Sequence, residues 1–127
     1  MSNQFLLDGD PNLWRDLSAS LEDCRLDVLA GNAYRRALNG PDDDDVRHRL
    51  ARLLYKRGQT REAIDFLAGI KTFTLESYND FCNFAHWTGA YGTLKSVVDR
   101  HAPSLPYFRF RSELAMAFVW RALAQPD

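Results

Sequence analysis

The chain has 127 residues and a formal net charge of −1, and 46% of its residues are hydrophobic while 26% are charged. This length suits one folded domain with a sizeable core, and the composition argues against a disordered or membrane-embedded protein. The nearly neutral charge gives no overall attraction to nucleic acid or to anionic lipid, so we expect neither as a partner.

The first ten residues are polar apart from one short apolar cluster. Phe5, Leu6 and Leu7 are followed by Asp8 and Asp10, so the cluster is too short for the apolar core of a signal peptide. No run of 18 or more apolar residues occurs, and we therefore expect no membrane-spanning helix. The sequence predicts a cytoplasmic protein.

Residues 11–41 contain two apolar patterns with helical spacing. Asp10 and Pro11 are typical of an N-cap and the first helical residue, and Asn39-Gly40-Pro41 is typical of a helix end. Between them we expect two helices, separated by a break near residues 23–27. Their apolar residues are Leu13, Trp14, Leu17 and Leu21, then Val28, Leu29, Ala33, Tyr34, Ala37 and Leu38.

Residues 44–73 predict a second pair of short helices. One apolar face around Leu50, Leu53 and Leu54 ends at Gly58, and another resumes at Ala63 and continues to Leu67. Glycine is favoured at the left-handed position that ends a helix. Thr60 is predicted to cap the following helix.

Residues 74–106 predict a third pair, and residues 107–123 one last helix. Thr74 opens a helix that Gly89 closes, and a partner helix begins near Tyr91. After Pro106, an amphipathic helix carries Phe108, Phe110, Leu114, Ala117, Phe118, Trp120 and Leu123.

A shift of 33 residues superimposes the first pair on the second. Leu17 falls on Leu50, Ser18 on Ala51, Leu21 on Leu54, Ala30 on Ala63 and Tyr34 on Leu67. The third pair follows the second at an offset of 31, because Gly58 falls on Gly89. In that register Leu94 replaces a small alanine.

This pattern resembles the tetratricopeptide repeat (TPR). The first unit matches its residue order most fully, from Trp14 to Pro41, whereas the second unit has Arg47 in place of the aromatic residue and lacks the closing proline. The resemblance implies an all-α solenoid, formed as a single TPR-like domain of about three helical hairpins. The units are residues 11–41, 44–73 and 74–106, and residues 107–123 form a C-terminal capping helix.

The resemblance also implies that the first helix of each hairpin lines a concave groove. The groove positions carry basic and hydrogen-bonding side chains, which suit the backbone and the carboxylates of a bound peptide. The alternative is that these are ordinary solvated positions on amphipathic helices. The expected groove residues are Arg15, His48, Arg52, Tyr55, Lys56, Asn79, Asn83 and His86.

Other chemistry has little support in the sequence. No nucleophile, base and orienting group can be assembled, no glycine-rich phosphate loop is present, and the run Asp42–Asp45 lacks the spacing of a calcium loop. Cys82 and His86 lie one helical turn apart but have no further ligands at suitable spacing. We expect no catalysis, no metal and no cofactor, and we expect Cys24 and Cys82 to be buried, reduced thiols.

The sequence therefore predicts a non-catalytic module that binds a peptide or helix of a partner protein. An adaptor or a small bacterial chaperone, such as the three-repeat chaperones of type III secretion, would fit this size. Two alternatives stay open: a helical docking or regulatory domain of a longer or associated enzyme, and a homodimer formed through the C-terminal helix.

Overall fold

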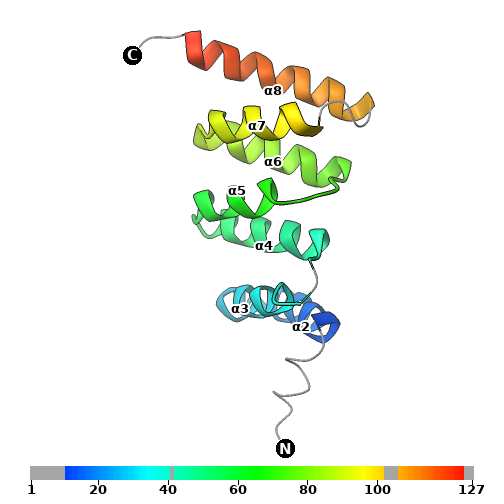
Figure 1. Ribbon diagram of the computed structural model, residues 1–127. Coiled ribbons are helices and arrows are strands. Elements are labelled where there is room, and N and C mark those ends of the chain that lie inside the picture. The colour runs from blue at the N-terminus through cyan, green and yellow to red at the C-terminus, as the bar shows by residue number, and fades with distance from the viewer. Residues whose placement is uncertain (1–10, 41, 102–105, 125–127) are drawn as a thin grey trace, which may run out of the picture. The chain divides into compact units, whose positions relative to one another are not determined.

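The computed structural model describes residues 11–40, 42–101 and 106–124, and these residues form seven helices (Figure 1). The chain divides into two compact units, residues 1–66 and 67–127, and the boundary falls in the last turn of α5. The expectation of a single domain stays a prediction. None of the described helices combines the length and the apolar character that a membrane crossing requires.

The first unit contains α2 (Pro11–Asp23), α3 (Asp27–Ala37), α4 (Asp44–Lys56) and most of α5 (Thr60–Ala68). Helices α2 and α3 pack together as a hairpin, and α3 also packs on α4. Side chains from α3 and α4 meet at α5, where the guanidinium groups of Arg35 and Arg47 lie 5.7 and 5.9 Å from the centre of the Phe66 ring. The predicted helix around Leu50, Leu53 and Leu54 that ends at Gly58 is confirmed, and so is the break near residues 23–27.

Three helices end in the same type of turn, in which one residue at the C-cap or directly after it takes a left-handed backbone conformation. The left-handed residues are Arg25 with φ 61°, Gly58 with φ 85° and Gly89 with φ 75°. In each turn the next N–H donates to a carbonyl five residues back, at 2.9, 2.9 and 2.8 Å in chain order. The turns lie 33 and 31 residues apart, which are the offsets that the repeat alignment predicts.

Burial follows the same register. Ser18 and Ala51 are both fully buried, as are Ala30 and Ala63, and so are Tyr34 and Leu67. Small residues at the first two pairs let neighbouring helices approach closely. Leu17 departs from its equivalent, because it is 36% exposed whereas Leu50 is completely buried.

The second unit contains α6 (Leu75–Thr88), α7 (Tyr91–His101) and α8 (Pro106–Ala124), which pack on one another in all three pairings. Helix α6 begins with a capping box in which Thr74 and Ser77 satisfy each other's backbone N–H groups. The core around them is aromatic: the Tyr78 and Phe108 rings are stacked 4.4 Å apart, and the Tyr78 hydroxyl bonds to Ser112 at 2.5 Å. These contacts fix α8 on α6.

Two local expectations need correction. Cys82 is buried, but Cys24 is exposed, because it lies in the turn after α2. Helix α5 begins at Thr60 itself, and the carbonyl of Gln59 accepts the first helical hydrogen bond, from Ala63 N–H at 3.1 Å. Gln59 therefore holds the N-cap position that was expected for Thr60. The predicted cap Asp10 lies outside the described residues.

Candidate partner-binding surface

Four of the expected groove residues share one face of α4. His48, Arg52, Tyr55 and Lys56 are spaced by four, three and one residues, which places them along a single stripe of a helix. The stripe is graded: His48 is only 8% exposed, Tyr55 is half-buried, and Arg52 and Lys56 are exposed. The exposed end of α4 therefore presents two cations beside a phenol ring.

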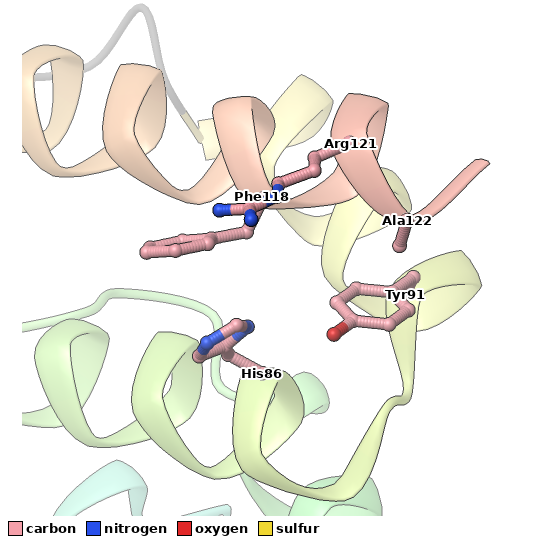
Figure 2. A pocket seen from close by; sticks show the side chains of 5 residues that line it. All are labelled: His86, Tyr91, Phe118, Arg121 and Ala122. Atoms are coloured by element: carbon pink, nitrogen blue, oxygen red, sulfur yellow. The ribbon is translucent and has the colours of Figure 1, made fainter. Parts of the chain in front are cut away.

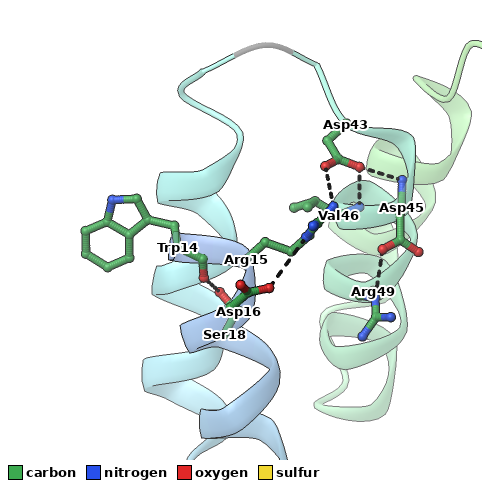
Figure 3. A network of polar contacts seen from close by, with 8 residues as sticks. All are labelled: Trp14, Arg15, Asp16, Ser18, Asp43, Asp45, Val46 and Arg49. Atoms are coloured by element: carbon green, nitrogen blue, oxygen red, sulfur yellow. Dashed lines mark hydrogen bonds and ion pairs between the residues drawn. The ribbon is translucent and has the colours of Figure 1, made fainter. Parts of the chain in front are cut away.

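Arg15 reaches α4 from α2. Its Nη1 lies 3.6 Å from a carboxylate oxygen of Asp43, the residue that caps α4 by accepting from the N–H groups of Asp45 and Val46 (Figure 3). The carboxylate thus meets both the positive end of the helix and a guanidinium. Within the first unit, Arg15 acts as a link between α2 and the start of α4.

A second set of polar contacts joins α2, α3 and α4. The Tyr34 hydroxyl donates to a Glu22 carboxylate oxygen at 2.7 Å, and Lys56 Nζ lies 3.8 Å from Asp27. Burial and the neighbouring Glu22 carboxylate raise the pKa of Tyr34, so the phenol stays neutral. The Lys56 side chain is 70% exposed, and its ion pair contributes little to stability.

Asn79, Asn83 and His86 share one face of α6 in the second unit. The Asn83 side-chain oxygen accepts a 2.6 Å hydrogen bond from Arg111 on α8. The His86 ring on α6 lies 4.1 Å from the ring of Phe118, which is also on α8. Two of the expected groove residues on α6 therefore contact side chains of α8. The sequence analysis expected α8 only as a capping helix.

A pocket opens beside His86, between α6, α7 and α8 (Figure 2). Its volume is about 340 Å³, at the small end of the range of ligand sites. The side chains that line it are His86, Tyr91, Phe118, Arg121 and Ala122. Of these, only His86 was an expected site residue.

Arg111, Phe118 and Arg121 were not among the expected groove residues. All three lie on α8, more than 20 residues after Asn83 and His86, and their contacts depend on how α8 packs on α6. One signal was present: Phe118 and Arg121 follow one another at helical spacing on the predicted last helix. That spacing does not say which neighbour they face.

The comparisons with known proteins bear on the fold. No protein family model and no curated protein matches the chain. A crystal structure of nearly identical TPR-like repeats, in a Podospora anserina chain named as a kinesin light chain, is similar with a TM-score of 0.59. The two sequences are 20% identical, and the match covers 91% of this chain and 67% of the other.

The chain has a TPR-like fold of helical repeats. The expected fold class, an all-α solenoid of helical hairpins, is confirmed by this likeness and by the helices, turns and repeat offsets described above. Stacked helical repeats in general form extended surfaces.

Proposed function

We propose that the chain is a non-catalytic adaptor or small chaperone that binds a peptide or helix of a partner protein. The TPR-like fold is the observation that carries this proposal. Within the first unit, the contact surface would be formed by the first helices of the two hairpins, α2 and α4. Such a surface would bind an extended or helical segment through backbone hydrogen bonds and charge pairs.

The exposed half of the α4 stripe supports this assignment. Arg52 and Lys56 hold positive charge at the surface, and Tyr55 offers an apolar ring with a polar tip beside them. Phenol and guanidinium groups are enriched where interfaces derive most of their binding energy. The weak pair between Lys56 and Asp27 is easily replaced by a carboxylate of a partner, so we expect an acidic segment.

Site-specific photocrosslinking in the source cell tests this surface. A photoreactive amino acid replaces Arg52 on α4 in one variant and Arg61 on α5 in the matched control. Both positions are exposed, so neither change should disturb folding. We expect one protein partner to crosslink at position 52 and not at position 61.

The result separates the remaining possibilities. Equal crosslinking at both positions, or crosslinking only at position 61, would contradict binding on α4. In a second arm, Arg52→Glu should weaken capture of the crosslinked partner at least tenfold, because it places a negative charge opposite an acidic segment. An enzyme as the sole partner would favour a docking domain over an adaptor. The cytoplasmic location and the type III secretion-like role stay predictions.

A homodimer through α8 is a second candidate, because this helix exposes four large apolar side chains. The exposed fractions are 74% for Phe110, 45% for Leu114, 58% for Trp120 and 64% for Leu123. Exposed apolar surface of this kind marks contact sites. Sedimentation equilibrium should show a monomer–dimer equilibrium that Phe110→Lys shifts to monomer, and a strict monomer over a wide concentration range would exclude it.

A further inference from the structure

The pocket of Figure 2 has an electrostatic bias toward anions. Arg121 brings a guanidinium to it, and none of the five lining residues is acidic. Arg121 makes no ion pair with any residue that the structure describes, whereas Arg109, three turns earlier on the same helix, lies 3.5 Å from Glu113. A guanidinium without a carboxylate beside a pocket favours an incoming carboxylate, which it can bind in bidentate fashion.

His86 adds a second donor. Its Nδ1 is enclosed and has no hydrogen-bond partner among the described residues. Buried N–H groups without an acceptor are rarer in proteins than buried acceptors without a donor, which favours the tautomer with its proton on Nε2. In that tautomer Nε2–H is the donor that the imidazole offers, and the Phe118 ring 4.1 Å away restricts the orientation of the imidazole.

The remaining walls are apolar. The Phe118 and Tyr91 rings and the Ala122 methyl group surround the same space, and the Tyr91 ring lies 6.1 Å from the imidazole. Aromatic walls favour an apolar or aromatic group, which a bare inorganic anion or a short acidic side chain would not supply. About 340 Å³ suits one such group and not a folded surface.

We propose that this pocket binds a carboxylate attached to an apolar or aromatic group, as found at the C-terminal residue of a peptide. Arg121 and His86 receive the carboxylate, and Phe118 and Tyr91 contact the apolar group. The inference rests on the proposed function in one respect: it assumes that the C-terminal residue belongs to a protein partner. The pocket itself can be tested without that partner.

The test is an NMR titration of the full chain with two probes, N-acetylphenylalanine and its amide. The probes share every atom of the apolar group and differ in the carboxylate. We expect saturable shifts of the His86, Tyr91 and Phe118 resonances with the acid, with a Kd on the order of 1 mM for a ligand of this size. The amide should bind at least tenfold more weakly. Free glutarate is a third probe, which carries a carboxylate on a short chain without an aromatic group, as an acidic side chain does. It too should bind more weakly than N-acetylphenylalanine.

Three variants complete the test. Arg121→Gln should remove the preference for the acid, and Arg109→Gln, a matched change on the same helix, should leave it intact. Ala122→Leu fills the pocket and should weaken both probes, with folding checked by circular dichroism. Equal binding of acid and amide to the wild type, a preference that survives Arg121→Gln, or no saturable shift would each overturn the proposal. These outcomes leave crosslinking at position 52 unaffected, so a failure here is distinct from a failure of the proposed function.

Discussion

Replacing Arg25 with glycine should stabilise the first unit. Arg25 has φ 61° in the turn where Gly58 and Gly89 hold the equivalent positions. An L-residue in this conformation brings its Cβ close to the following carbonyl oxygen, which glycine avoids. The Arg25 side chain is exposed and forms no ion pair with the described residues, so its removal should sacrifice little.

The magnitude follows from two opposing effects. Relief of the left-handed strain contributes about 1–2 kcal/mol. The greater backbone freedom of glycine in the unfolded chain subtracts about 0.4–1 kcal/mol. The difference lies between about 0 and 1.6 kcal/mol. We therefore expect the free energy of unfolding to rise by about 0.8 kcal/mol, or a few degrees in Tm for a protein of this size.

Urea unfolding followed by circular dichroism measures this change, with the slope m checked for constancy. Arg25→Ala is the matched control, because it removes the same side chain and keeps the strain, so it should give no stabilisation. Gly58→Ala is the reverse experiment. A Cβ there meets nothing within 4 Å, so its expected cost of about 1 kcal/mol would come from the backbone alone. Equal stability of Arg25→Gly and Arg25→Ala would refute the reasoning.

Two further predictions concern the buried side chains. Burial raises the pKa of Tyr78 to about 12 and that of Cys82 to about 11, above their values of 10.0 and 9.0 in the unfolded chain. The unfolded state therefore loses these protons first, so the contribution of these two groups to the free energy of unfolding should be constant below about pH 9 and fall between pH 9 and 12. A shift of two pKa units corresponds to a fall of about 2–3 kcal/mol for each group, and an unchanged slope above pH 10 in Tyr78→Phe would contradict the prediction. In the second prediction, Leu94→Ala should destabilise by about 2–5 kcal/mol in urea, because Leu94 is fully buried on α7. The reverse change at the equivalent fully buried position, Ala63→Leu, should destabilise by about 1–3 kcal/mol through overpacking, and tolerance of both changes would show that the two hairpins pack alike.

The helices and their turns could be predicted from the sequence because their signals are local. Gly58 and Gly89 end helices at left-handed positions, and Thr74 begins one, through hydrogen bonds to residues within a few positions along the chain. The offset of 33 places the first turn at Arg25 even though no glycine stands there. The repeat pattern therefore predicted the break near residues 23–27, although arginine itself disfavours the left-handed conformation that it adopts there.

The surface residues were only partly predictable. The repeat resemblance assigned Arg52 and Lys56 to one face of a helix, and both are exposed on α4, since neighbours on a helix face follow from periodicity. It could not show that Arg15 binds Asp43, or that Asn83 binds Arg111. Those contacts join residues 28 positions apart on different helices, and they arise only when the helices pack.

For the last helix, the sequence predicts the helix itself, and only the tertiary structure determines which of its faces is buried. One face of α8, with Phe108, Ala115 and Val119, is buried, while Phe110 and Trp120 are exposed on the other. Both faces are apolar, so periodicity predicts a helix over residues 107–123 without choosing which side packs. Packing against α6 and α7 makes that choice, since only one face fits the stacked Tyr78 ring and the Ser112 hydrogen bond. That choice brings Phe118 and Arg121 to the pocket beside His86, which no local pattern in the sequence specifies.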